Sequence, residues 1–315
     1  MSLPRIGITL GDPGGIGPEI VIKSLSNLSA LPEAQYVIFG HSSLIEKETK
    51  ILGLKLDPAK VSIREAGAPV EIPRIGVADK ENGLASFLYF REAVEAARTG
   101  KIRAIVTAPI SKLSWKLGGI AFRSHTEYLE QLYPESLMTF WSAQMTVALF
   151  SHHLPLKEAV DKVTKENLLE FFRMLRESIE AAKAGHYEFL VAGLNPHAGE
   201  DGVLGREEQR EIIPAVEEAR AGGMNVHGPY PPDVVFRSAQ GHPEKVVIAL
   251  YHDQGLIAFK LNAFDTGVNV TLGMPFIRSS PDHGTAFDIA GKNLADPRSM
   301  VEAIRLAYEL SPRSF

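Results

Sequence analysis

Three histidines each follow an apolar run that is typical of a buried strand. TVALFSHH carries His153, FLVAGLNPH carries His197 and VVIALYH carries His252. In a parallel α/β sheet the carboxyl ends of the strands form the ligand crevice, so these imidazoles are expected to meet although they are distant in sequence. Three neutral imidazoles bind zinc and similar divalent ions and leave positions for water or substrate. The competing interpretation of each histidine alone is a hydrogen-bonded loop residue.

The composition narrows the chemistry that such a site could use. The 315-residue chain has no cysteine, so a metal must be held by His, Asp, Glu or carbonyl oxygen, and thiol nucleophiles are excluded. A formal net charge of -5 gives no basic surplus for nucleic acid or an anionic membrane. The N-terminal MSLPRIGITLGDPGG lacks the longer apolar stretch of a signal peptide or membrane span, and a cytoplasmic protein is expected.

Apolar runs alternate with amphipathic segments along the chain, which predicts an α/β/α fold with a mainly parallel sheet. The length suggests two lobes that share an interlaced sheet. A helix is expected over 168–182, capped by Thr164 and ended at Gly185, and a last helix is expected to begin at Asp296 and Pro297. The expected strands are 6–10, 36–40, 104–108, 146–150, 189–194, 246–251 and 268–272.

Two glycine-bearing segments could bind anions. GDPGGIGPE, from Gly11 to Glu19, follows the first strand and opens a helix whose amino end offers N–H groups. It matches neither G-x-G-x-x-G nor a P-loop, and a tight structural turn explains it equally well. The segment from Ser279 to Lys292 is too polar for a core strand and is interpreted as an ordered binding loop. Arg278 is a candidate for contact with phosphate or carboxylate.

A set of motifs spans nearly the whole chain: GDPGGIGPE (11–19), TAPISK (107–112), HTE (125–127), HLPL (153–156), GLNPHAGEDG (193–202), GPYPPDVVF (228–236), YHDQGL (251–256) and VNVTLGMPFIRSSPDHGTAFDIAGK (268–292). Taken together and in this order, these motifs resemble the 4-hydroxythreonine-4-phosphate dehydrogenase (PdxA) family of vitamin B6 biosynthesis. The chain departs from the family pattern at Ser124, His152, Pro232 and Val234, and it has AGKN where the family more often has AGKG. These departures concern the choice of substrate more than the chemistry.

The resemblance implies a two-lobed fold like that of isocitrate and isopropylmalate dehydrogenases, with a mixed, mainly parallel sheet. It also implies a homodimer with the active site at the subunit interface. The expected lobes are 1–124 with 266–315, on the cofactor side, and 125–265, which holds the metal and the dimer contacts. His153, His197 and His252 are implied ligands of one divalent ion per subunit, which could be zinc, magnesium or cobalt.

The resemblance also implies the residues that contact the small molecules. The loop DHGTAFDIAGK is similar to the adenosine-binding loop of isopropylmalate dehydrogenases, so Gly284, Asp288 and Gly291 are expected to contact NAD or NADP. The implied substrate contacts are His125, Thr126, Lys260, Asn269 and Arg278.

The implied activity is NAD(P)-dependent oxidation of 4-phosphohydroxy-L-threonine, followed by decarboxylation to 3-amino-2-oxopropyl phosphate. A bound metal would lower the pKa of the substrate alcohol so that hydride can leave to the nicotinamide. Lys112 and Asp233 are candidate proton acceptors by motif position. Three alternatives stay open: a dehydrogenase of threonate or erythronate 4-phosphate, a three-histidine metallohydrolase, and a binding protein without turnover.

Overall fold

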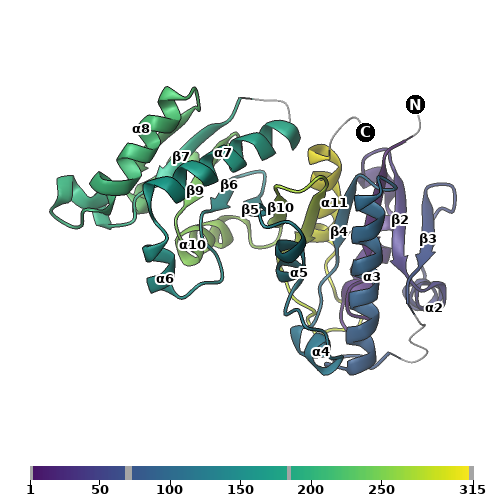
Figure 1. Ribbon diagram of the computed structural model, residues 1–315. Helices are drawn as coiled ribbons and strands as arrows, with labels where there is room; N and C mark the ends of the chain where they lie inside the picture. The colour runs from purple at the N-terminus through teal and green to yellow at the C-terminus, as the bar shows by residue number, and fades with distance from the viewer. Residues whose placement is uncertain (1–2, 68–72, 183–185, 312–315) are drawn as a thin grey trace. The chain divides into compact units, whose positions relative to one another are not determined.

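The computed structural model describes residues 3–67, 73–182 and 186–311, which divide into two compact units (Figure 1). Unit 1 comprises Met1–Pro134 and Met274–Phe315, and unit 2 comprises Glu135–Gly273. The expected lobes differ from these units over two segments. Residues 125–134 belong to unit 1, because helix α5 (His125–Leu132) packs against an aromatic side chain of that unit, Phe90. Residues 266–273 belong to unit 2, because strand β10 (Val268–Leu272) pairs with a strand of that unit.

Unit 1 is built on a parallel sheet in the order β3-β2-β1-β4-β11. The run Ile6–Thr9 is fully buried, as expected for a strand covered on both faces. Parallel pairing brings the carboxyl ends of all these strands to one edge. The strands are Arg5–Thr9 (β1), Gln35–Gly40 (β2), Val61–Glu65 (β3), Ala104–Thr107 (β4) and Ile277–Pro281 (β11).

Helices cover both faces of this sheet, as two adjacent residues of β11 demonstrate. The Arg278 side chain reaches His125 of α5, whereas Ser279 Oγ donates to the Ala303 carbonyl of α11 (Arg298–Leu310) at 2.8 Å. Since successive strand residues point to opposite faces, α5 and α11 lie on opposite sides. Helix α3 (Lys80–Arg98) packs along β1, β2 and β4 in Figure 1. The other helices of unit 1 are Gly17–Ser26 (α1), Ser42–Leu52 (α2), Lys112–Leu117 (α4) and the short 3-10 turn Leu28–Ala30.

Unit 2 has a mixed sheet in the order β10-β5-β6-β9-β7-β8. β5 runs antiparallel to both of its neighbours, while β6, β9, β7 and β8 are parallel to one another. A mainly parallel, mixed sheet is therefore confirmed. The remaining strands are Leu137–Trp141 (β5), Thr146–Leu149 (β6), Glu188–Ala192 (β7), Val226–Tyr230 (β8) and Lys245–Ala249 (β9).

The expected helix over 168–182 is found as α7 (Lys165–Ala182), which packs beside α8 in unit 2 (Figure 1). Thr164 caps it, since its Oγ1 accepts from Asn167 N at 3.3 Å, and the apolar face from Leu168 to Ala182 is buried. Each buried Leu, Ile or Phe side chain on this face stabilises the fold by about 1.5–3 kcal/mol. Gly185 lies outside the described residues. The other helical segments are Leu156–Asp161 (α6), Pro196–Gly202 (η2), Glu208–Ile212 (η3), Ile213–Ala221 (α8), Pro232–Ala239 (α9) and His252–Ala263 (α10).

All the expected strands are present, but the interpretation of 279–292 as a loop throughout is wrong. Ser279, Ser280 and Pro281 belong to β11 and are buried. A polar strand is tolerated there because its side chains have partners, such as the Ala303 carbonyl for Ser279. The loop begins only after β11. Within the part of the chain that the structure describes, no helix is long and apolar enough to cross a bilayer.

Candidate active site

The three predicted metal ligands all follow strands of unit 2 that are neighbours in the sheet. His153, His252 and His197 come after β6, β9 and β7, and these strands pair in parallel in that order. Their carboxyl ends therefore share one edge of the sheet, as the sequence indicated.

His153 and His252 lie together at this edge. Their ring centroids are 5.7 Å apart, and both line a cavity of about 290 Å³ with Ser151, His152 and Tyr251. Asp253 Oδ1 lies 2.7 Å from His252 Nδ1, which fixes the ring and directs Nε2 as the atom able to bind a ligand. Two imidazole donors are thus assembled, one of them oriented by a carboxylate.

Gly255 explains how α10 brings His252 so close to the strand that leads to His153. A Cβ at this position would lie 2.7 Å from Leu149 Cδ2 and 2.9 Å from Val147 Cγ1, both on β6. Any larger residue would push the amino end of α10 away from β6. The glycine in YHDQGL is therefore part of the site's construction.

His152 lines the same cavity but differs from its neighbours in burial. Burial first, and then the charges of His153 and His252, lower its pKa to about 4. Its ring centroid is 5.3 Å from that of His153. The ring is accordingly neutral near pH 7.

His197 does not line this cavity. It is exposed and starts a run of residues with left-handed backbone angles, with φ of 55° at His197. His153 also has a positive φ, of 52°. Such angles cost about 1 kcal/mol or more for a residue with a Cβ and are concentrated at functional sites. Among the described residues, no three His, Asp or Glu side chains are close enough together to hold a metal ion.

Hydrogen bonds nevertheless tie the three histidine-bearing loops to one another at the backbone. Ser151 Oγ donates to the Leu250 carbonyl at 2.7 Å, which links the loops after β6 and β9. Gln254 Oε1 accepts from Leu250 N, and its Nε2 donates to the Gly193 carbonyl, both at 2.7 Å. Gln254 thus links the loops of His252 and His197.

The loop of His197 has a second anchor that the sequence did not suggest. Glu208, which is 1% exposed, accepts from Leu194 N at 2.8 Å and from Asn195 N at 2.7 Å through Oε1. Its Oε2 accepts from Asn195 Nδ2 at 2.8 Å. Three hydrogen bonds to one buried carboxylate fix the start of this loop. Only the fold reveals Glu208, because it is separated from the loop by an irregular segment.

Unit 1 assembles two of the predicted substrate contacts, Arg278 and His125, through a residue that was not predicted. Arg278 donates to Thr107 Oγ1 through Nε at 3.0 Å and through a terminal nitrogen at 2.7 Å. That terminal nitrogen also lies 3.3 Å from His125 Nδ1. A guanidinium can only donate, so Nδ1 accepts and the neutral ring carries its proton on Nε2.

Burial governs the electrostatics of this cluster. It lowers the pKa of Arg278 to about 10, and together with the charge of Arg278 it holds the pKa of His125 well below its usual value. The buried Nε2 of His125 has no hydrogen-bond partner among the described residues. The cluster thus pairs a buried cation with an unpartnered N–H donor, an arrangement suited to an anionic group.

The other predicted site residues are spread over both units. Thr126 is buried next to His125 in unit 1, where Lys112 is exposed at the start of α4. In unit 2, Lys260 lies on α10, Asn269 on β10, and Asp233 is exposed in the first turn of α9. The cofactor residues Gly284, Asp288 and Gly291 are exposed on the segment between β11 and α11.

Comparisons with known proteins identify relatives over nearly the full length of the chain. A model of the family described as pyridoxal phosphate biosynthetic protein PdxA matches residues 32–307. A protein of Aquifex aeolicus named 4-hydroxythreonine-4-phosphate dehydrogenase is 43% identical over 320 residues, which cover 97% of this chain and 98% of that protein. A protein of Oceanobacillus iheyensis, provisionally named a D-threonate 4-phosphate dehydrogenase, is 39% identical and covers 98% of each.

Solved structures extend the likeness to the fold. The crystal structure of a 4-hydroxythreonine-4-phosphate dehydrogenase from Burkholderia phymatum covers 100% of both chains with a TM-score of 0.84 and 36% identity. An isocitrate dehydrogenase from Methylococcus capsulatus covers 98% of this chain and 85% of its own with a TM-score of 0.54 and 15% identity, a likeness of fold alone. The expected fold class is confirmed.

Proposed function

This chain belongs to the PdxA family, and we propose that it is a dehydrogenase that oxidises 4-phosphohydroxy-L-threonine with NAD or NADP. The oxidised product loses CO₂ and leaves 3-amino-2-oxopropyl phosphate, a precursor in vitamin B6 biosynthesis. The structural observation that carries the proposal is the close approach of His153 and His252, which line one cavity at the carboxyl ends of parallel strands. The similarity of the named relatives supports the choice of substrate.

We propose that one divalent ion is held by His153, His252 and His197, although among the described residues the structure brings together His153 and His252 without the third ligand. The first two rings are already close together, and Gln254 ties the loop of His197 to theirs. Zinc, magnesium and cobalt are the candidates, of which imidazole favours zinc and cobalt over magnesium. When bound, the ion supplies a Lewis acid that lowers the pKa of the substrate hydroxyl and favours loss of CO₂.

The residues of the chain itself bind and orient the substrate. Arg278, fixed by Thr107, provides a forked cation for the phosphate or the carboxylate, and His125 adds the N–H donor on Nε2. Thr126, Lys260 and Asn269 are proposed as further contacts. Lys112 and Asp233 are proposed as alternative proton acceptors on their motif positions alone.

The exposed segment after β11 is proposed to hold the nicotinamide cofactor through Gly284, Asp288 and Gly291. Gly291 has a φ of 73°, which only glycine adopts at low cost. All three residues are exposed, while Ala290 and Ala295 on the same segment are buried. One side of the segment is therefore fixed to unit 1, and the other is open to a ligand.

A homodimer is proposed from an uncovered apolar stripe on α10 and on Phe264, the residue that follows this helix. Ile257, Leu261 and Phe264 recur at helical spacing and are 62%, 83% and 74% exposed. Lys260 lies on the same helix, so a partner subunit on this stripe would place a proposed substrate contact at the interface. Leu261→Glu is expected to reduce the sedimenting species from dimer to monomer, and an unchanged dimer would contradict this use of the stripe.

A dehydrogenase of D-threonate or erythronate 4-phosphate is the second candidate function. The relative from Oceanobacillus iheyensis supports it at 39% identity. A three-histidine metallohydrolase and a binding protein without turnover are disfavoured as functions, because the named relatives are dehydrogenases. A cytoplasmic location stays a prediction from the sequence.

The deciding experiment is a panel of four-carbon phosphorylated acids assayed by NADH or NADPH absorbance, with and without added zinc, magnesium or cobalt. We expect metal-dependent reduction of NAD or NADP with 4-phosphohydroxy-L-threonine as the substrate of highest kcat/KM. Preference for D-threonate 4-phosphate would select the second candidate. Absence of nucleotide reduction with every acid in the presence of each metal would refute both.

A further inference from the structure

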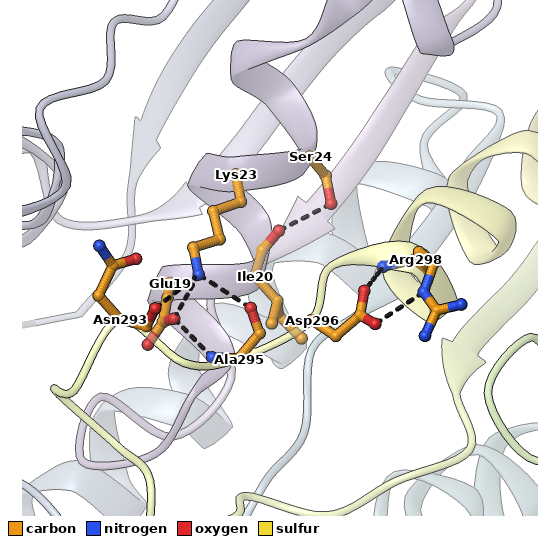
Figure 2. Close-up of polar contacts among 8 residues, drawn as sticks. All are labelled: Glu19, Ile20, Lys23, Ser24, Asn293, Ala295, Asp296 and Arg298. Carbon is orange, nitrogen blue, oxygen red and sulfur yellow. Dashed lines mark hydrogen bonds and ion pairs between the residues drawn. The ribbon is translucent and has the colours of Figure 1, made fainter.

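Glu19, the last residue of GDPGGIGPE, fastens the first helix to a segment that is nearly three hundred positions away in the chain (Figure 2). It is 2% exposed, and its Oε1 accepts from Ala295 N at 2.8 Å and from Lys23 Nζ at 2.7 Å. Lys23 Nζ in turn donates to the Ala295 carbonyl at 2.9 Å and to the Asn293 carbonyl at 3.4 Å. Both peptide groups of Ala295 are thus bound by one ion pair.

The same GDPGGIGPE segment also contacts the other end of the proposed cofactor loop. Ile16 N donates to the Thr285 carbonyl at 3.0 Å. A Cβ on Gly15 would lie only 2.9 Å from that carbonyl oxygen, so the glycine permits the close approach. Residues 285 and 295 bracket Asp288 and Gly291, so the segment holds the loop at two points.

An ion pair that stabilised α1 alone would not require contacts with the backbone of Ala295 and Asn293. Lys23 and Glu19 are spaced i,i+4, and such pairs stabilise a helix surface without burial or bonds to another segment. Here the carboxylate is buried and accepts from a distant backbone N–H, so its removal would leave that N–H unsatisfied. The observed bonds therefore act on the position of the loop.

We infer that Glu19 is a positioning residue for nicotinamide cofactor binding, acting through Ala295 on the loop that carries Gly284, Asp288 and Gly291. The inference rests on the proposed function, because it takes that loop as the cofactor site. A loop fixed before binding loses less conformational entropy when the dinucleotide binds, and this difference appears in the affinity for cofactor. The reacting groups are left in place, so turnover with saturating cofactor is preserved.

The test measures the dissociation constant of NADH by fluorescence titration, and kcat and KM for both substrates, in Glu19→Met, Glu19→Gln and Lys23→Met. Glu19→Met removes both bonds and is expected to raise the dissociation constant about tenfold or more. Glu19→Gln can still accept from Ala295 N and is expected to lie between Glu19→Met and the natural chain. Lys23→Met removes the bonds to the two carbonyls and the ion pair with Glu19, but it leaves Glu19 able to accept from Ala295 N, so it should also give an intermediate value.

Glu302→Met is the matched control, since it removes an ion pair with Arg305 on α11 of the same unit. Its dissociation constant for NADH should stay within about twofold of the value for the natural chain. In every variant, kcat at saturating cofactor and KM for the acid should also stay within about twofold of the natural values. Thermal unfolding establishes which variants are folded at the assay temperature. If Glu19→Met is unfolded at that temperature, Glu19→Gln and Lys23→Met provide the test.

The outcomes separate the inference from the function on which it rests. A natural chain that binds neither NADH nor NADPH overturns the proposed function. A natural chain that binds, together with folded Glu19 and Lys23 variants that bind within twofold of it, overturns the inference alone. The inference would also be overturned if the variants lowered kcat, raised KM for the acid and weakened cofactor binding by equal factors. It would be overturned as well if all three variants were unfolded. Either result would assign Glu19 to folding.

Discussion

The two units fix their candidate site residues by different means. In unit 1, the side chains bond to one another: Arg278 donates twice to Thr107 and once towards His125. In unit 2, the bonds fix the backbone instead, since Ser151 and Gln254 join the loops that carry the histidines. The histidines there follow regular strands, on backbone that includes left-handed angles.

This difference fits the two proposed tasks. An oxyanion such as phosphate has a fixed shape, and its recognition benefits from donors whose directions are set before binding. Metal ligands need the right positions of several loops, with a partner on the far nitrogen of a ring, as Asp253 provides for His252. Variants in the two units should therefore fail in different ways.

The largest effect is expected from the histidines of unit 2. His252→Ala and His153→Ala should each lower kcat by about 10²–10³-fold or more, because the Lewis acid would be lost. KM for the cofactor should change little. His242→Ala, on an exposed histidine of the same unit, is the control and should retain activity. Activity retained by either ligand variant in buffer stripped of metal would contradict the account.

Arg278→Lys tests the side-chain network of unit 1 and should have the next largest effect. A lysine keeps the charge but cannot donate the forked pair of hydrogen bonds, so KM for the acid should rise by about 10–100-fold. Bound metal, measured by elemental analysis, should be unchanged. Arg298→Lys, on an exposed pair with Asp296, provides the matched control. A loss of metal with no change in KM would reverse the roles given to the two units.

Gln254→Leu should weaken the backbone ties of unit 2 while leaving every proposed ligand in place. Loss of both bonds should raise the dissociation constant for the metal by about 10-fold, the lower end of the range for residues that support metal ligands. Gln254→Glu keeps the acceptor for Leu250 N but loses the donor to the Gly193 carbonyl, and should have an intermediate effect. Calorimetric titration measures both, and unchanged affinity in Gln254→Leu would remove the proposed role of the ties.

The pH dependence of stability should report on His125, with the smallest effect. Burial and the charge of Arg278 lower its pKa in the folded state, so below about pH 6.5 the unfolded chain binds a proton that the folded chain does not. The free energy of unfolding therefore falls as the pH falls, by up to about 1.4 kcal/mol per unit for this site. Between pH 6 and 5, the free energy of unfolding should depend less steeply on pH in His125→Gln than in the natural chain. The control His242→Gln should keep the natural slope. Urea unfolding at each pH provides the measurement, and an unchanged slope in His125→Gln would contradict the burial of a neutral ring.

The sequence predicted the buried parallel strands well, because a run such as Val246–Ala249 is apolar throughout. It missed β3, β5, β8 and β11, and in β3 and β11 the charged or hydroxyl side chains hide the pattern. The polar strand β11 depends on partners such as Ala303 of α11, which no local pattern contains.

For the site, the tendency of ligands to bind at the carboxyl ends of parallel strands identified the positions of His153, His252 and His197. The resemblance to the family identified Arg278 and His125. Neither assigned a role to Glu208 or to Thr107, although Thr107 opens the motif TAPISK. Their roles arise from hydrogen bonds to Arg278 and to the backbone at Asn195, and those contacts exist only in the folded chain. Residues that position other residues carry little chemical signature of their own.

The most direct test of the central claim is a calorimetric titration of Co²⁺ into chain stripped of metal, compared for the natural sequence and for His153→Ala, His197→Ala and His252→Ala. One high-affinity ion per chain is expected for the natural sequence, and its loss is expected in each of the three variants. Binding that persists at the same stoichiometry and affinity in His197→Ala would contradict the three-histidine centre.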